Sequence, residues 1–279
     1  MQLKATRRYA IIVLYCMLFY ALLLYKLYNG MLLYQMQPVF FYTRQDVFTW
    51  LFMQTGLHQW LLNNTSGCLL FDVVFYTAPA IYFLHYRNNS QTAYLSGIYM
   101  LLVNWVYVQC YTLYATNSIE GHLAWLLFPL VFLPKKEEGF ALLLAGLRYF
   151  FLFFFASAGL WKLRQRGVFN TSEMTGILLI QHKELLTNSP LYWQSRFILW
   201  LIQHQTISYL LYVSATVMEL VFIVGFFTKK FDKALLVLFL VFLVMDYLVM
   251  RIPYFEVAPL LLTLYPGLGS YGKGQFVTA

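Results

Sequence analysis

Apolar runs recur along the chain between short polar stretches, and most have the length of a membrane helix. A helix that crosses a bilayer needs roughly 20 mostly apolar residues. The fourth and eighth runs are shorter, so we expect each to be half-buried or re-entrant. The pattern predicts an all-α, polytopic transmembrane helical bundle of about seven to eight spans, with residues 1–279 forming a single bundle. The runs lie near residues 9 to 28, 68 to 86, 92 to 115, 121 to 133, 140 to 161, 206 to 227, 233 to 250 and 254 to 266.

Two connections between these runs are long, one from about residue 29 to 67 and one from 164 to 205. Short apolar stretches in the first predict small interfacial helices. The second has the polar starts and apolar periodicity of two helices, Thr171 to Leu186 and Leu191 to Ile202, on either side of Pro190. We expect both connections to cover the outer face of the bundle.

Composition excludes a soluble domain. Hydrophobic residues make up 61% of the chain and charged residues 11%, whereas about a quarter of an ordinary soluble domain is charged. The 20% of aromatic residues suits helices whose ends lie at a membrane interface. The three cysteines, Cys16, Cys68 and Cys110, have no metal-ligand spacing, so we expect no metal site and read them as small buried hydrophobes.

A net charge of +8 would suggest nucleic acid in a soluble protein, but here the basic residues cluster at the ends of apolar runs. Topology and contact with anionic membrane lipids explain them better, so we expect no nucleic-acid partner. With a cytoplasmic amino terminus, the positive-inside rule is satisfied by most short connections. The residues that it places on the cytoplasmic side are Arg87, Lys135, Lys136, Lys229, Lys230 and Lys233.

Ionisable residues inside apolar runs are the first candidates for function, because a charge at bilayer depth costs several kcal/mol unless it is paired or solvated. Six of the eight candidates lie toward the outer leaflet on the predicted topology, where they would form a polar pocket beneath the outer connections. The eight are Asp72, His122, Arg148, Lys162, Glu219, Asp246, Arg251 and Glu256.

Lys162 is the candidate with the most specific surroundings. Arg148 and Lys162 are fourteen residues apart on one apolar helix and so return to nearly the same face. Small residues ending at Gly159 let a neighbouring helix approach closely beside Lys162, where a lysine is able to act as a base. The alternatives are a lysine that snorkels to the interface, an Arg148 that reaches the cytoplasmic interface and a His122 that only caps its helix.

The acidic candidates also have structural alternatives. Glu219 lies deep in its run and must be paired or protonated, and a structural partner competes there with a proton relay. For four of the six outer residues the alternative is an ion-pair network with no substrate. These four are Asp72, Asp246, Arg251 and Glu256.

The stretch from Leu147-Arg148 to Ala158-Gly159-Leu160-Trp161-Lys162-Leu163 resembles the signature helix of the horizontally transferred transmembrane domain family. That family includes the membrane part of vitamin K-dependent gamma-carboxylase, and its helix carries an Arg before an Ala-Gly-x-x-Lys-Leu ending. Gly121-His122-Leu123-Ala124-Trp125 is similar to an Asn-His-x-x-Tyr helix start, and Met218-Glu219-Leu220 resembles an acidic position. The resemblance covers about residues 69 to 266 and implies a transmembrane bundle.

In the carboxylase the matching lysine deprotonates vitamin K hydroquinone and the matching histidine supports the glutamyl chemistry. The resemblance therefore implies that Lys162 is a catalytic base and His122 an acid or hydrogen-bond donor. The chain departs from the family at Gly176, which Glu173 precedes instead of a nearby Trp, and at Leu243, where a His is expected. It ends at Ala279, without the carboxylase's large carboxy-terminal domain, so we do not expect full gamma-carboxylation.

Two functions follow from the sequence. The preferred one is a multi-pass protein of a bacterial inner membrane whose outward-facing pocket binds a lipid or quinone-like molecule, with proton or redox-linked chemistry at Lys162 and His122. The alternative is a non-enzymatic subunit or scaffold of a larger envelope complex, with a membrane or envelope protein as its partner. Whether the protein is an enzyme depends on which of the two holds.

Overall fold

The computed structural model describes residues 2–36, 47–114 and 120–265. Over these residues the chain forms thirteen α-helices and four 3-10 helices, and no strand. The predicted fold class, an all-α helical bundle, is confirmed. Residues 115 and 266, at which two predicted runs end, lie outside the described residues.

The chain divides into two compact units, the first within Met1–Leu147 and Phe255–Thr263, and the second within Arg148–Tyr254. Helix α7 (Glu137–Arg164) contributes to both. The prediction that residues 1–279 form a single bundle stays a prediction.

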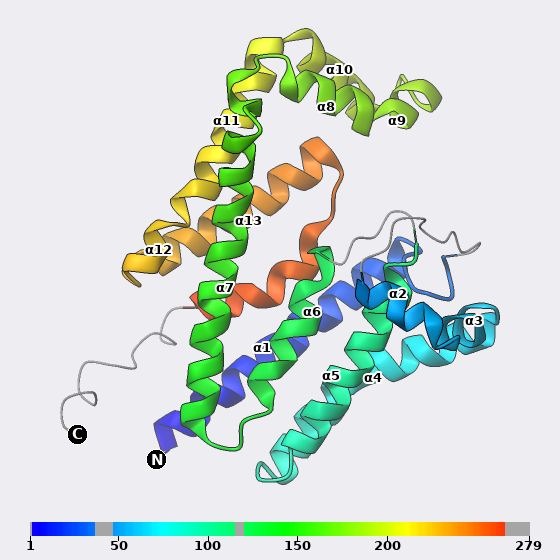
Figure 1. The fold of residues 1–279 in the computed structure, drawn as a ribbon, viewed down its shortest axis with the longest axis vertical. Coiled ribbons are helices and arrows are strands. Elements are labelled where there is room, and N and C mark those ends of the chain that lie inside the picture. The colour runs from blue at the N-terminus through cyan, green and yellow to red at the C-terminus, as the bar shows by residue number, and fades with distance from the viewer. Residues whose placement is uncertain (1, 37–46, 115–119, 266–279) are drawn as a thin grey trace. The chain divides into compact units, whose positions relative to one another are not determined.

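In the first unit, α4 and α5 form a helical hairpin with α1 beside α4 (Figure 1). Asn64 begins α4, because its side chain accepts a hydrogen bond from the N–H of Ser66 at 2.9 Å. The elements of this unit before α7 are α1 (Gln2–Tyr28), α2 (Val47–Gln54), α3 (Leu57–Leu62), α4 (Thr65–Asn88), α5 (Tyr94–Tyr111), η1 (Glu120–His122), α6 (Leu123–Leu127) and η2 (Phe128–Phe132); most of η4 (Tyr254–Leu264) also belongs to it.

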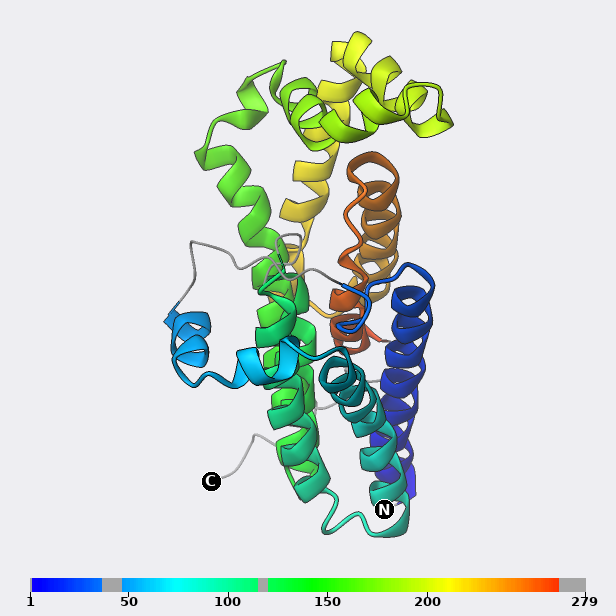
Figure 2. The ribbon, with the colours of Figure 1, turned by 90° about the vertical axis from the view of Figure 1, so that its right-hand side faces the viewer.

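In the second unit, the helices α8 to α10 run crosswise at one end of α11 and α13, as both ribbon views show (Figures 1 and 2). Arg251, with φ 56°, ends α13 in the left-handed conformation. The elements that follow α7 are η3 (Gly167–Phe169), α8 (Glu173–Gln181), α9 (Lys183–Asn188), α10 (Trp193–Gln203), α11 (Gln205–Val221), α12 (Val224–Phe227) and α13 (Asp232–Met250).

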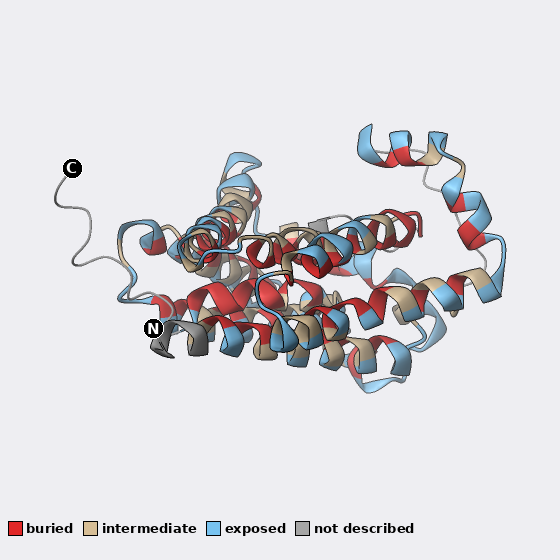
Figure 3. Cartoon of the chain, turned by 90° about the horizontal axis from the view of Figure 1, so that it is seen from below, coloured by how far each residue is buried: buried red, intermediate tan, exposed pale blue. Residues whose placement is uncertain are grey.

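Five helical segments are long and apolar enough to cross a membrane, which fits an integral membrane protein. They are Arg7–Tyr28, Thr65–Asn88, Glu137–Arg164, Gln205–Phe227 and Asp232–Met250. Exposed residues recur along the long helices (Figure 3), and many are large and apolar, as expected of surfaces that face lipid.

Three other predicted runs take different forms. Helix α5 lies where the third span was predicted but is not among the five, because Asn104, Gln109 and four tyrosines lower its hydropathy. The fourth and eighth runs form the short apolar segments Leu123–Phe132 and Tyr254–Leu264. Short helices also occupy both long connections, as predicted, while their place at the membrane surface stays a prediction.

Aromatic side chains fill the core of each unit. In the first, the rings of Phe75 and Tyr107 stack with centroids 3.7 Å apart, and Trp125 packs against Phe75 at 5.1 Å. In the second, Phe155 packs against Phe239 at 4.7 Å. A smaller apolar cluster joins α8 and α10 to α11 and α13, and it contains Met174, Leu178, Ile198, Leu201, Tyr212 and Val249.

Candidate functional site

A buried ion pair between Lys26 and Glu256 joins two helices of the first unit. Lys26 is in the last turn of α1 and Glu256 in the first turn of η4. The Lys26 Nζ lies 2.6 Å from the Glu256 Oε1 and donates a hydrogen bond of 2.8 Å to the hydroxyl of Tyr111. The Lys26 side chain is 0% exposed and that of Glu256 6%. Such a pair persists only because each charge has the other as its partner.

Aromatic rings complete the surroundings of this ammonium group. The Lys26 Nζ lies 4.3 Å from the ring centre of Tyr111 and 5.2 Å from that of Trp125, within the range of cation–π attraction. The Tyr111 hydroxyl donates in turn to the carbonyl of Met31 at 2.9 Å. Lys26 is therefore held by a carboxylate, a hydroxyl and two ring faces.

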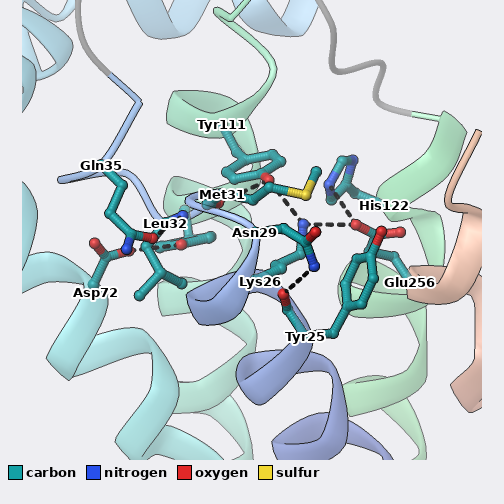
Figure 4. Close-up of polar contacts among 11 residues, drawn as sticks. Tyr25, Lys26, Asn29, Met31, Leu32, Gln35, Asp72, Tyr111, His122 and Glu256 are labelled. Atoms are coloured by element: carbon teal, nitrogen blue, oxygen red, sulfur yellow. Dashed lines mark hydrogen bonds and ion pairs between the residues drawn. The ribbon is translucent and has the colours of Figure 1, made fainter. Parts of the chain in front are cut away.

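His122 meets the same carboxylate. Its Nε2 lies 3.8 Å from the Glu256 Oε1, the oxygen that Lys26 also contacts, and Figure 4 shows both side chains pointing at it. The His122 ring packs on Tyr111 and Trp125, with centroids 4.8 and 5.2 Å away. One carboxylate oxygen is thus shared by two groups that are able to carry a proton.

Asp72 fixes the chain that follows α1. Its carboxylate accepts hydrogen bonds from the backbone N–H groups of Leu33 and Tyr34, at 3.2 and 3.1 Å, and from the hydroxyl of Tyr107 at 2.7 Å. All three donors lie in the first unit. Because these three donors bind both of its carboxylate oxygens, Asp72 has a structural role in the described part of the chain: it holds the segment that follows α1 against α4 and α5.

In the second unit, Lys162 pairs with Glu219 of α11. The Lys162 Nζ lies 2.8 Å from the Glu219 Oε1 and 5.5 Å from the ring centre of Tyr212. Gly159, one turn before Lys162, allows this contact, since a Cβ there would lie 3.0 Å from Leu220 and 3.1 Å from the Cβ of Glu219. The expectation that small residues admit a neighbouring helix beside Lys162 is confirmed.

This cluster keeps open hydrogen-bonding capacity. The Glu219 Oε2 and the Asp246 Oδ2 are buried, and neither has a hydrogen-bond partner among the described residues. Asp246 is close enough to Lys162 and Glu219 to interact with both charges. The Lys162 side chain is 27% exposed while that of Glu219 is 4% exposed, so the lysine is the accessible edge of the cluster.

Arg148 joins three segments of the second unit. Its guanidinium binds both carboxylate oxygens of Asp232, at 3.0 and 2.5 Å, and donates to the carbonyl oxygens of Gly225 at 2.9 Å and Thr228 at 3.4 Å. This two-pronged geometry is the strongest that an arginine makes with a carboxylate. Arg148 therefore anchors the turn before α13 instead of reaching an interface freely.

The structure gives the remaining candidate, Arg251, a backbone role at the end of α13, where its N–H donates to the carbonyl of Tyr247 at 3.1 Å. The eight predicted residues fall into two sets, with Asp72, His122 and Glu256 in the first unit and the other five in the second. That six of them, namely Asp72, His122, Lys162, Asp246, Arg251 and Glu256, share one outward-facing pocket stays a prediction.

Sequence reasoning missed Lys26 and its partner Tyr111. Lys26 is close to the end of an apolar run, which is where an ordinary snorkelling lysine is found, so nothing in the local pattern marks it. The one signal is an acid of opposite charge in the last apolar run, Glu256. Glu256 and Lys26 are 230 positions apart in the sequence, and no periodicity predicts a contact over that separation.

Comparison of the chain with models of known protein families, with curated proteins and with solved structures finds no match.

Proposed function

We propose that this integral membrane protein is a member of the horizontally transferred transmembrane domain family and binds a lipid or quinone-like molecule at the cluster formed by Lys162, Glu219 and Asp246. The family proposal rests on the resemblance of the helix from Leu147 to Leu163. The ligand proposal rests on the open hydrogen-bonding capacity beside Lys162.

The observation that carries the ligand proposal is the pair of carboxylate oxygens, one on Glu219 and one on Asp246, that lack partners among the described residues. A buried acceptor without a donor costs about 1–3 kcal/mol, so a hydroxyl-bearing ligand gains affinity by supplying the missing donor. Lys162, which has two further N–H donors besides the one given to Glu219, offers a hydrogen bond to an oxygen of the same ligand.

Proton transfer is the chemistry that this arrangement supports. A hydroxyl bound between the two carboxylates is able to pass its proton to one of them, and the nearby ammonium group of Lys162 stabilises the negative charge left on the ligand oxygen. His122, which shares Glu256 with Lys26, is a second acid–base candidate in the first unit. Both roles are proposals about chemistry at buried ionisable groups.

The test is native mass spectrometry of the full chain, extracted in mild detergent from its own host. We expect a small molecule of the lipid or quinone class bound in stoichiometric amount to the wild type and lost from Lys162→Ala. Lys183→Ala is the matched control, because Lys183 is an exposed lysine on α9, and it should keep the molecule.

Three outcomes distinguish the ligand-binding function from the alternative. Loss of the molecule from Lys162→Ala alone supports the ligand site. Equal retention in Lys162→Ala and wild type overturns it. A stoichiometric protein partner without any small molecule supports the alternative, a non-enzymatic subunit of an envelope complex. The two variants should first show the same elution volume and helical circular dichroism as the wild type, so that misfolding is recognised.

We further propose that the amino terminus faces the cytoplasm of a bacterial inner membrane, on the basis of the basic connections at Arg87, Lys135 and Lys229. Single cysteines introduced at Asn89 and at Lys230, in a chain whose own three cysteines are replaced, should react with a membrane-impermeant maleimide only after the cells are opened. Labelling in intact cells would reverse the orientation.

A further inference from the structure

Helix α10 has two unlike faces. Its inner face is buried against the other helices of the second unit and contains Gln194, Ser195, Ile198 and Leu201. Its outward face carries a row of aromatic and basic side chains at helical spacing, which we name the α10 stripe; it consists of Trp193, Arg196, Trp200 and His204. The partly buried Phe197 lies at the edge of this stripe and packs against the apolar cluster of the second unit. Trp193 is 58% exposed and Trp200 42% exposed. Two large indole rings exposed on one helix face indicate a surface that binds a partner.

The position of α10 limits what that partner is. Helix α10 ends at Gln203, and the membrane-spanning segment Gln205–Phe227 begins two residues later. From this assignment of the span, we expect the end of α10 at the depth where a span meets the membrane surface. In both ribbon views α10 runs crosswise to α11 (Figures 1 and 2). A helix that lies in the plane of the membrane interface has this orientation relative to a membrane-spanning helix.

The chemistry of the α10 stripe matches that depth. Tryptophan is enriched at membrane interfaces, where the ring lies at the headgroup level. The rings of Phe197 and Trp200 stack with centroids 6.4 Å apart, and Trp200 packs on His204 at 4.6 Å. Trp200 and His204 therefore form a stacked pair that rests on Phe197, while Trp193 is exposed one turn earlier on the same face.

Arg196 gives this surface a charge. It is exposed, and it is the one charged side chain between Leu191 and Gln205. No carboxylate lies within 4.0 Å of it among the residues that the structure describes. A guanidinium with free N–H groups binds a phosphate through two parallel hydrogen bonds. The α10 stripe thus combines an unpaired cation with two interfacial anchors.

We propose that the α10 stripe binds the headgroup of an anionic phospholipid, with Arg196 on the phosphate and with Trp193 and Trp200 at the boundary between headgroup and acyl chain. The proposal is independent of the ligand at Lys162, because it uses none of that cluster's residues. A protein partner would also use exposed tryptophan and arginine, but the crosswise helix at the start of a span favours lipid.

The experiment uses the full chain in nanodiscs of phosphatidylcholine that contain a minor fraction of phosphatidylglycerol. Native mass spectrometry then counts the lipids that stay bound when the protein is released. We expect the wild type to retain phosphatidylglycerol in preference to phosphatidylcholine. One basic residue at a membrane surface contributes about 1 kcal/mol, so Arg196→Gln should lower retention of phosphatidylglycerol roughly fivefold.

Two further variants make the result specific. Lys183→Gln removes an exposed charge from the neighbouring α9 and should leave retention unchanged. Arg196→Lys keeps the charge but loses the two-pronged geometry, so it should retain an intermediate amount. Because Arg196 is exposed, its variants should unfold at the temperature of the wild type, which the same samples report by circular dichroism.

Equal retention of phosphatidylglycerol by Arg196→Gln and the wild type overturns the proposal. So does equal retention of both lipids by the wild type, which would mean that the headgroup charge is not recognised. A host protein that remains bound to the wild type and is lost from Arg196→Gln also overturns it, because the α10 stripe would then be a protein interface.

Discussion

Lys26 and Glu256 form an ion pair in which Nζ and Oε1 lie 2.6 Å apart and almost no part of either side chain is exposed. The pair joins α1 to η4, which are near opposite ends of the chain. Because the two charges are buried together, each depends on the other for its stability. Removing one charge should therefore cost far more than removing both.

The first prediction concerns this dependence. Lys26→Met removes the ammonium group that neutralises Glu256 and leaves His122, at 3.8 Å, beside its carboxylate. We therefore expect the free energy of unfolding to fall by roughly 3–5 kcal/mol. The double variant Lys26→Met with Glu256→Gln should recover a large part of that loss. Thermal unfolding of the three proteins in one detergent measures the coupling. Equal losses in the single and double variants would contradict it.

The second prediction concerns Arg148. Arg148→Met leaves the carboxylate of Asp232 and the carbonyl of Gly225 without their donor, and we expect a loss of roughly 3–5 kcal/mol for this buried pair. Arg164→Met, at the exposed end of the same helix, should change the free energy of unfolding by no more than about 0.5 kcal/mol. Similar unfolding midpoints for the two variants would show that Arg148 is not an anchor.

A third prediction compares two glycines of α7. A Cβ at Gly159 would lie 3.0 Å from Leu220, whereas one at Gly146 would have nothing within 4 Å. Gly159→Ala should therefore destabilise the protein by about 1–3 kcal/mol and weaken the contact between Lys162 and Glu219. Gly146→Ala should be neutral or stabilising by up to about 1 kcal/mol, since alanine favours the helix. Unfolding midpoints of both variants test this contrast.

The fourth prediction concerns pH and His182, which lies between α8 and α9 outside the membrane spans. Burial lowers the pKa of His182 below its ordinary value, and the charge of Arg251 lowers it further, although the hydrogen bond to the carbonyl of Val249 opposes both effects. The unfolded chain therefore binds a proton more readily than the folded one. The stability that neutral His182 contributes is complete above its ordinary pKa of about 6.5 and is lost as pH falls through the lowered value.

Limited proteolysis of the α8 to α10 region at a series of pH values measures this effect. Cleavage should increase below about pH 6.5 in the wild type. In His182→Gln, whose amide is able to donate to the Val249 carbonyl without titrating, the increase should be smaller. An unchanged pH profile in His182→Gln would assign the effect to another group.

Hydrophobic patterning predicted the helical elements well, because a run of apolar residues determines a membrane helix largely by itself. The break between Thr171–Leu186 and Leu191–Ile202 was predicted from local polar residues. Patterning did not predict the extra break at His182, which divides α8 from α9. That break depends on packing, since the His182 Nε2 bonds the carbonyl of Val249 at 2.7 Å.

Candidate residues were predictable in kind but not in pairing. The cost of burying charge singled out Lys162 and Glu219, and the small residue Gly159 indicated a close neighbour. The partners of Arg148 and Glu256, namely Asp232 and Lys26, were not predicted, because each lies at the end of an apolar run where exposure is the usual state. Their burial depends on how distant segments fold together.

Asp72 has a consequence for the exchange of backbone hydrogens with solvent. The amide hydrogens of Leu33 and Tyr34 belong to a connection outside any helix, where amides ordinarily exchange fast. Because both are held by the Asp72 carboxylate, they should exchange as slowly as amides inside α4. Slow exchange of these two amide hydrogens would show that the first unit is folded, and it can be measured without knowing any ligand of the protein.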